Sequence, residues 1–214
     1  MAVAAAAFMQ GMLRIGYSSY SKIGLNYPLM DRLSNGSLVE LVRKCREGDL
    51  HSMEILYGNF KSSLFGLAYR YTYNFAVAED LLQDIFIKVF TNLHTLDEDE
   101  AFTGWMYRVA VNTCLSYVRS HKRMLQKTIA LEEVEAFVSD TSSIDVEKAS
   151  NKPLEEAIQS LPAKLKSAFL LHDIQGFKHK EIAQILGCSV GTSKSQLFKA
   201  RKKIRKYLES KKLL

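Results

Sequence analysis

Residues 180–206 constrain the fold of this chain more than any other stretch, because they have the pattern of two helices joined by a short turn. Three apolar residues of the first half recur at intervals of three and four: Ile182, Ile185 and Leu186. Gly187 then supplies the left-handed backbone that ends a helix. Ser189 can cap the next helix by accepting a hydrogen bond from an unpaired backbone amide. We therefore predict a helix-turn-helix whose second helix starts near Val190.

The second helix of this unit is strongly basic. From residue 187 to the end, the chain has nine Lys or Arg and one acid, a surplus of eight that exceeds the +6 of the whole chain. The apolar residues of this helix recur on one side, namely Leu197, Ile204 and Leu208. Lys and Arg side chains occupy the remaining surface. A surplus this local favours a polyanion such as nucleic acid as the partner. A basic tail on a solvent-exposed helix is the alternative.

The rest of the chain also has helical spacing and few strand signals, so we predict an all-α protein. A length of 214 residues suits two small domains. The predicted order is an N-terminal extension over 1–36, a helical domain over 37–127, a linker over 128–153 and a second helical domain over 154–210. The linker has six acids and two Lys, a net charge of −4, and a polar Ser/Thr/Asp centre.

The N-terminal extension is expected to be poorly ordered and to add little to a core. Its first thirty residues contain no acid, and no charged leader precedes their apolar run, so they do not match a signal peptide. A transit-like presequence would also be acid-poor. We favour an over-extended start, for which Met30 is a candidate first residue, or a loosely ordered tail.

Several functional classes are disfavoured by what the sequence lacks. Cys45, Cys114 and Cys188 lie far apart without a CxxC pair, which predicts neither disulfides nor a zinc site but reduced thiols in a cytoplasmic protein. The five His are scattered, so we assign no metal. No apolar window has the length of a membrane span, and we predict no stable membrane insertion. Without a nucleophile–base pair or a Gly-rich phosphate loop, we predict no enzyme and no cofactor.

The stretch 76–92 predicts a helix with an unusual outer face. Its inner stripe is complete, comprising Ala78, Leu81, Leu82, Ile85, Phe86, Val89 and Phe90. The outer face holds Asp80, Gln83, Asp84 and Lys88 around a single aliphatic residue, Ile87. An apolar residue with a polar rim is typical of a protein-docking surface. A charged solvent-exposed face with one stray Ile explains the pattern equally well.

The charge reverses between residues 79–100 and residues 101–127. The first range has seven acids and one Lys, and the second has five bases and no acid. The helix predicted in the second range carries an aromatic ring, two cations and an amide on one face: Trp105, Arg108, Asn112 and Arg119. This combination suits single-stranded nucleic acid, because unstacked bases gain from aromatic rings and the backbone gains from cations. From the residues alone, a core role for Trp105 is the stronger interpretation.

Taken together, these motifs resemble an extracytoplasmic-function sigma factor, the smallest class of bacterial RNA polymerase sigma subunits. The likeness covers residues 37–210. AEDLLQDIFIKVF resembles region 2.2, residues 102–112 resemble regions 2.3 and 2.4, and the segment from LPAKLKSAFLL through the helix-turn-helix resembles region 4. A lone helix-turn-helix is a weak signal, whereas three motifs in this order with an acidic linker are specific. The resemblance implies a region 2 helical bundle and a region 4 helix-turn-helix domain.

The family's functions then imply roles for particular residues, carried over by position. The region 2.2 helix of the family binds the β′ clamp of core RNA polymerase, which implies docking by Asp80, Gln83, Asp84, Phe86 and Ile87. Minus-10 recognition and promoter melting would be carried by Trp105, Tyr107, Arg108, Asn112 and Arg119. Minus-35 recognition in the major groove would be carried by Thr192, Lys194, Ser195, Gln196, Phe198, Lys199, Arg201 and Lys202.

Two positions of the second helix depart from the family pattern. Ser193 stands where Val is usual, which would loosen the packing of this helix, and Gln196 stands where Arg is usual. Because Gln suits adenine better than guanine, the preferred minus-35 sequence does not transfer. The resemblance also implies an anti-sigma factor as a partner. A freestanding helix-turn-helix regulator that needs no polymerase is the alternative function, and a purely protein-binding helical adaptor is a weaker one.

Overall fold

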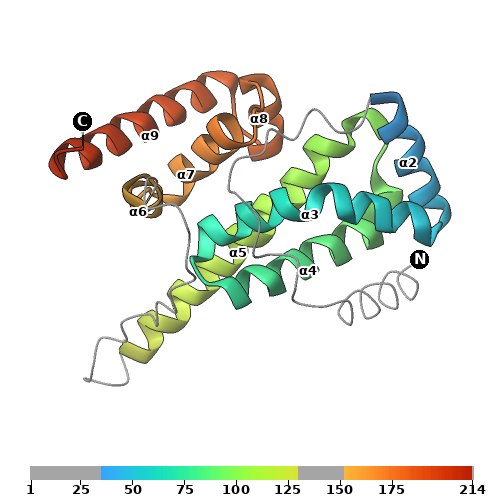
Figure 1. The fold of residues 1–214 in the computed structure, drawn as a ribbon, viewed down its shortest axis with the longest axis horizontal. Coiled ribbons are helices and arrows are strands. Elements are labelled where there is room, and N and C mark those ends of the chain that lie inside the picture. The colour runs from blue at the N-terminus through green and yellow to red at the C-terminus, as the bar shows by residue number, and fades with distance from the viewer. Residues whose placement is uncertain (1–34, 130–151, 214) are drawn as a thin grey trace.

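The computed structural model describes residues 35–129 and 152–213, and within these ranges the chain is helical with no strand, which confirms the predicted all-α class. The chain forms two helical domains (Figure 1). The long helices of the first domain are α2 (Asn35–Glu47), α3 (Leu50–Thr72), α4 (Phe75–Asn92) and α5 (Phe102–Ile129). The second domain consists of α6 (Lys152–Gln159), α7 (Ala163–Phe169), the π-helical turn η5 (Leu170–Ile174), α8 (His179–Leu186) and α9 (Val190–Ser210).

The first domain is a bundle in which α2, α4 and α5 all pack against α3, and α4 also packs against α5 (Figure 1). Its core is the stripe that the spacing predicts, since all seven inner residues of α4 are buried. On α3 the buried set includes Leu56, Phe60, Leu64, Leu67, Ala68 and Tyr71. Burying such side chains contributes roughly 1.5–3 kcal/mol each, which fixes the position of α4 relative to α5.

Helix ends in this domain are set by local side-chain chemistry. Asp49 caps α3 by accepting a hydrogen bond from the Ser52 amide at 3.0 Å, and Asn74 caps α4 by accepting one from the Val77 amide at 3.1 Å. The first helix α2 begins at Asn35, so Ser37 lies within its first turn and not at its N-cap.

The acidic segment between α4 and α5 contains two short 3₁₀ turns, Leu93–Thr95 and Asp99–Ala101. Arg46 of α2 ties it to the bundle, donating to the Asp99 carboxylate at 2.6 Å and to the Leu96 carbonyl at 2.8 Å. Phe102 then enters the core with no exposed surface. The acidic loop is therefore held against α2, at one end of the gap between α4 and α5.

The helix-turn-helix has the predicted boundaries. Gly187 ends α8 in the left-handed conformation at φ 61°, and the side chain of Ser189 accepts a hydrogen bond from the Thr192 amide at 3.0 Å. At the start of α8 the Lys178 amide donates to Glu181 at 2.7 Å. Leu197 is buried on α9, as its spacing predicts.

The two domains lie against each other, with α8 against α5 and α6 against α3 (Figure 1). The helix α5 continues to Ile129, and α6 begins at Lys152 and includes Pro153 in its first turn. The predicted extension over 1–36 and linker over 128–153 lie largely outside the described residues, so the domain boundaries stay a prediction.

Candidate nucleic-acid and protein interfaces

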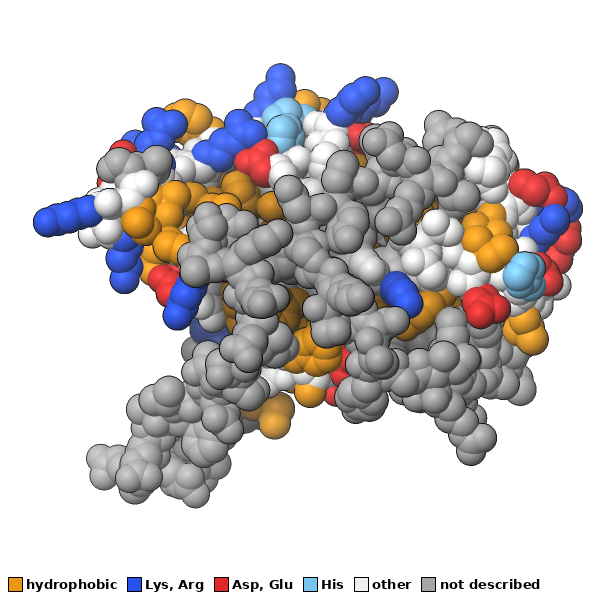
Figure 2. Space-filling view, in the orientation of Figure 1, with side chains coloured by type: hydrophobic (Ala, Val, Ile, Leu, Met, Phe, Trp, Pro, Cys, Tyr) orange, Lys and Arg blue, Asp and Glu red, His pale blue; other side chains and the backbone are white. Residues whose placement is uncertain are grey.

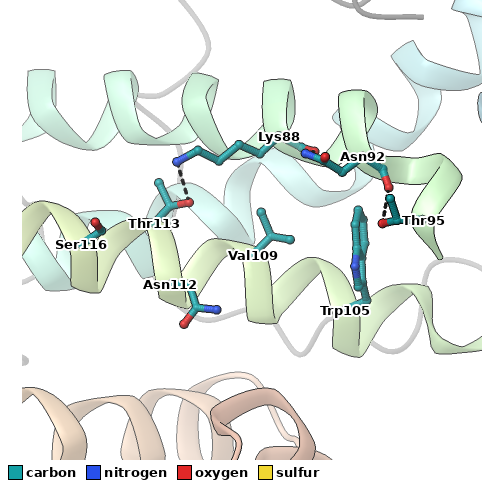
Figure 3. Close-up of a pocket in the computed structure, with 8 residues that line it drawn as sticks. All are labelled: Lys88, Asn92, Thr95, Trp105, Val109, Asn112, Thr113 and Ser116. Atoms are coloured by element: carbon teal, nitrogen blue, oxygen red, sulfur yellow. Dashed lines mark hydrogen bonds between the residues drawn. The ribbon is translucent and has the colours of Figure 1, made fainter.

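A groove of about 440 Å³ runs between α4 and α5 (Figure 3). It is lined by eight residues: Lys88, Asn92, Thr95, Trp105, Val109, Asn112, Thr113 and Ser116. The ring of Trp105 is half-buried and its centroid lies 6.2 Å from that of Phe102. Figure 3 shows the Trp105 ring and Val109 projecting from α5 into the space beneath α4. Trp105 therefore contributes to core packing and also forms part of the groove wall, where contact with nucleic acid stays a prediction.

Polar groups at the two ends of this groove are held in place by hydrogen bonds. Lys88 donates to the hydroxyl of Thr113 at 3.2 Å, and Thr95 donates to the carbonyl of Asn92 at 2.7 Å (Figure 3). The side chain of Asn112 is exposed. The groove thus presents an aromatic ring that can stack on a nucleic-acid base. It also presents a cation and amide groups that can form hydrogen bonds to the edges of that base.

The structure brings only part of the predicted minus-10 set to this groove. Trp105 and Asn112 line it, whereas Arg108 and Arg119 are exposed elsewhere on α5. Arg119 donates to the Leu115 carbonyl at 3.1 Å.

Tyr107 requires a correction, because its side chain has 0% exposure and cannot touch DNA in this arrangement. Tyr107 lies two residues from Trp105 and therefore faces the opposite side of α5. There it contacts Ser63, Gln175 and Phe177, and burial raises the pKa of its phenol.

Six groove residues were missed by the sequence analysis: Lys88, Asn92, Thr95, Val109, Thr113 and Ser116. Their spacing carries a signal. Lys88 and Asn92 are four apart on α4, while Trp105, Val109, Thr113 and Ser116 follow one another at intervals of four, four and three on α5. Two stripes of this kind on adjacent helices predict a shared wall once the helices are known to pack together.

The outer face of α4 presents most of the predicted polymerase-docking residues. Asp80 and Asp84 are exposed, Gln83 is half-buried, and Ile87 is 39% exposed. Phe86 is a correction: it has 0% exposure, its ring centroid lies 4.7 Å from that of Tyr57 in a tilted contact, and it belongs to the core. A direct polymerase contact by Phe86 is contradicted.

The second candidate surface is the outer side of α9. Five of the predicted minus-35 residues are polar and exposed, namely Lys194, Ser195, Lys199, Arg201 and Lys202. Phe198 is 69% exposed, which is unusual for an aromatic ring. Figure 2 shows Lys and Arg side chains along the upper edge of the molecule, where Figure 1 places α8 and α9.

Two further members of the minus-35 set have partners or burial that the sequence did not predict. Thr192 is bonded to the capping Ser189, with 2.9 Å between their hydroxyls. Gln196 is half-buried, and in the described part of the chain its Oε1 is one of three buried side-chain polar atoms without a hydrogen bond. An unpaired acceptor costs about 1–3 kcal/mol, so Gln196 gains if it turns outward to a base.

Arg201 is exposed but already engaged within the protein. Its Nε and Nη2 donate to the two carboxylate oxygens of Asp173 at 2.9 and 2.6 Å. Burial acts to raise the pKa of Asp173, but the hydrogen bonds from Arg201 and His172 outweigh it and the pKa is lowered. Phosphate binding by Arg201 therefore competes with this carboxylate.

Ser193, the other departure from the family pattern, is fully buried. Its hydroxyl lies 3.0 Å from Nδ1 of His179, so the polar group has a partner between α9 and the start of α8. The ring of His179 lies 4.8 Å from that of His172. A hydrogen bond thus replaces the apolar contact that Val would make.

All three cysteines are free thiols. Cys45 and Cys114 are buried free thiols, and burial raises the pKa of each to about 12. Within the ranges 35–129 and 152–213, no three His, Cys, Asp or Glu side chains are grouped to hold a metal ion. No helix in the same ranges combines the length and the apolar character that crossing a membrane requires.

Comparison with known proteins identifies the family. Residues 56–124 match the family model "Sigma-70 region 2" and residues 152–204 match "Sigma-70, region 4". The RNA polymerase sigma-H factor of Pseudomonas aeruginosa is 30% identical over 179 residues, which cover 79% of this chain and 93% of that protein. The ECF RNA polymerase sigma-E factor of Escherichia coli K12 is 32% identical over 185 residues, which cover 82% and 95%. The chain belongs to the ECF RNA polymerase sigma factors.

Solved structures share the fold of this sigma factor. The sigma factor RpoE of Bartonella quintana, solved with the anti-sigma factor NepR, has a TM-score of 0.59 at 23% identity and covers 73% of this chain and 96% of its own. CnrH, solved with the cytosolic domain of CnrY, has a TM-score of 0.61 at 18% identity and covers 81% and 97%. As a sigma factor the chain directs transcription initiation. A freestanding helix-turn-helix regulator is not favoured, because it would not account for the region 2 match.

Proposed function

We propose that this sigma factor binds the β′ clamp of core RNA polymerase through α4, reads the minus-35 element with α9, and holds the melted minus-10 strand in the α4–α5 groove. It acts in the cytoplasm as a non-enzymatic initiation factor without a cofactor, and the polymerase carries out the chemistry.

The observation that carries the proposal is the α4–α5 groove. A base extracted from the duplex gains about 1–3 kcal/mol by stacking on an aromatic ring, and Trp105 offers such a ring at the groove wall. Lys88, Asn92 and Asn112 offer hydrogen bonds to a base edge or a phosphate. Arg108, exposed on the same helix, adds a cation for the backbone.

The exposed side of α9 supports reading of the duplex. A helix of this width fits the major groove, where Lys199 and Lys202 would hold phosphates and Phe198 would make an apolar contact with a thymine methyl group. Gln196 suits adenine in a bidentate contact, and its unpaired Oε1 is free to accept one.

We also propose that an anti-sigma factor regulates this chain. One of the fold relatives was solved with the anti-sigma factor NepR and another with the cytosolic domain of CnrY. Both pairs share only the fold with this chain, so the identity of its own partner is a question for affinity capture from the source organism.

Reconstitution with core RNA polymerase on a cognate promoter tests the proposal. We expect open complexes that depend on both the polymerase and this chain. Promoter binding without polymerase-dependent melting would refute it.

For the docking surface, Asp84→Arg should abolish polymerase binding, because it places a cation beside Ile87 where the acidic rim is proposed to face the clamp. The matched control is Glu54→Arg, which makes the same charge change at an exposed acid of α3. Co-purification with core polymerase measures the effect. Equal loss in both variants, or an intact complex with Asp84→Arg, would contradict the proposed surface.

A further inference from the structure

A pair of histidine rings lies beside α9, the helix that is proposed to enter the minus-35 duplex. The ring centroids of His172 in η5 and His179 in α8 are 4.8 Å apart, and both side chains are half-buried. Figure 2 shows histidine among the Lys and Arg side chains at the upper edge of the molecule, where Figure 1 places α8 and α9. Two titratable rings therefore lie at the border of a surface that is proposed to bind a polyanion.

Each ring has a polar partner of a different kind. Nδ1 of His172 lies 2.7 Å from the carboxylate of Asp173, which also accepts both hydrogen bonds from Arg201. Nδ1 of His179 lies 3.0 Å from the buried hydroxyl of Ser193. A hydroxyl can donate to a neutral imidazole or accept from a protonated one, so Ser193 can satisfy His179 in either charge state. A valine at this position could do neither.

The surroundings of His179 disfavour its protonation in the free chain. Loss of water is the main cause that lowers the pKa of His179. The nearby cations lower it further, and Asp173 acts in the opposite direction; these cations are His172 from η5 and Lys194 and Arg201 from α9. Because two protonated rings this close would repel each other, the pair takes up protons one after the other.

A bound duplex would reverse this balance. Lys194 and Arg201 are exposed and belong to the proposed minus-35 surface. A phosphate that approaches them brings negative charge to the same cations that repel a proton from His179. A nearby opposite charge favours the protonated form of an imidazole, and an imidazolium offers an N–H donor on both ring nitrogens. Binding of the duplex and binding of a proton should then favour each other, because such coupling is reciprocal.

We propose that the His172–His179 pair, with Ser193 as its buried partner, is a proton-linked site for DNA backbone phosphate, which takes up a proton when α8 and α9 bind a minus-35 duplex. This inference rests on the minus-35 part of the proposed function. Affinity for the duplex rises as pH falls, because the bound state holds more protons than the free state.

Isothermal titration calorimetry of the full chain with a minus-35 duplex tests the inference. Repeating the titration at about pH 6.5, the ordinary pKa of histidine, in two buffers of different ionisation enthalpy measures the proton uptake directly. We expect an uptake of about 0.3 to 0.7 proton per duplex. At constant salt the affinity should increase about three- to tenfold from about pH 7.5 to about pH 6.0.

Three variants remove parts of the pair. His179→Gln and His172→Gln cannot titrate, so each should reduce the proton uptake and flatten the pH dependence of affinity. Ser193→Val removes the acceptor of the protonated ring and should also reduce the uptake. The matched control is His51→Gln, which removes an exposed histidine of α3 in the first domain and should behave as the wild type. Thermal unfolding of each variant shows whether it folds.

The possible outcomes separate the two proposals. Duplex binding with the same affinity and proton uptake in the wild type and all three variants would overturn the inference and leave minus-35 binding intact. A loss of uptake in His51→Gln equal to that in His179→Gln would also overturn it. A chain that binds no minus-35 duplex at any pH in this range would refute the minus-35 part of the proposed function, and the inference with it.

Discussion

The two candidate DNA-binding surfaces differ in shape, although both belong to helices rich in Lys and Arg. The surface on α5 is one wall of a groove, with Trp105 half-buried against Phe102. The surface on α9 is convex and projects Phe198 and the lysines into solvent. A concave wall receives a base that has left the stack, whereas a convex helix enters a groove that the duplex already provides. Under the proposed function, melting would depend on packing inside the first domain, and duplex recognition would depend on charge at the surface of the second.

The largest effect that would break this comparison is expected from Trp105→Ala. Loss of one stacking contact worth about 1–3 kcal/mol predicts a roughly 5- to 150-fold decrease in affinity for a single-stranded minus-10 oligonucleotide in complex with polymerase. Binding of a minus-35 duplex should not change. Trp105→Phe keeps an aromatic face and should recover part of the affinity, while thermal unfolding of each variant reports any loss of packing against Phe102. A loss of duplex binding equal to the loss of single-strand binding would show that the two surfaces are not separate.

A smaller effect in the opposite direction is expected from Asp173→Ala. This change frees Arg201 from its two hydrogen bonds, so the guanidinium can bind a phosphate. Affinity for a minus-35 duplex should rise about two- to fivefold, and the slope of log affinity against log salt should steepen by about one unit. Lys199→Ala should make the slope shallower by about one unit. An unchanged slope in Asp173→Ala would mean that Arg201 does not reach the backbone.

The smallest expected effect is that of pH on the contact between the two helical domains. Burial lowers the pKa of Lys166 to about 8, with Glu155 acting in the opposite direction. Between this value and the ordinary pKa of about 10.4, the chain binds fewer protons when its two domains are in contact than when they are apart. The contact between the domains therefore strengthens as pH rises. Burial raises the pKa of Tyr73 and Tyr107. Because tyrosines in the separated domains ionise near pH 10, the contact between the domains weakens above that pH. The expected window is therefore about pH 8 to 9.5.

Small-angle scattering of the free chain across that window checks this prediction. The radius of gyration should fall slightly as pH rises in the wild type and stay constant in Lys166→Met, which keeps the side-chain length without the charge. A radius of gyration of the wild type that increases from about pH 8 to about pH 9.5 would contradict the predicted direction of the effect.

The sequence was sufficient for features that depend on neighbouring residues. Gly187 and Ser189 end and start their helices through local backbone and capping preferences, and the structure has them as predicted. The buried stripe of α4 follows from its spacing alone. Both domains and their order could be predicted in this way.

Features that depend on distant segments could not be predicted. Phe86 belongs to the inner stripe by its spacing, and the resemblance assigned it to docking although the helix face assigned it to the core. Tyr107 lies at an intermediate position whose neighbours come from α3 and from the second domain. Arg201 of α9 pairs with Asp173, which lies 28 residues earlier in the π-helical turn η5. For Tyr107 and Arg201 the outcome depends on packing that no local pattern encodes, whereas the burial of Phe86 follows from the spacing of α4.

The helix α5 serves the groove with Trp105 and the interdomain contact with Tyr107, two residues further along. This arrangement has a genetic consequence. Substitutions at Trp105 and Asn112 should lower promoter activity through the groove, whereas substitutions at Tyr107, Ser63 and Gln175 should act through the contact between the two domains. Codons only two positions apart in one gene segment would then affect two different surfaces of the protein.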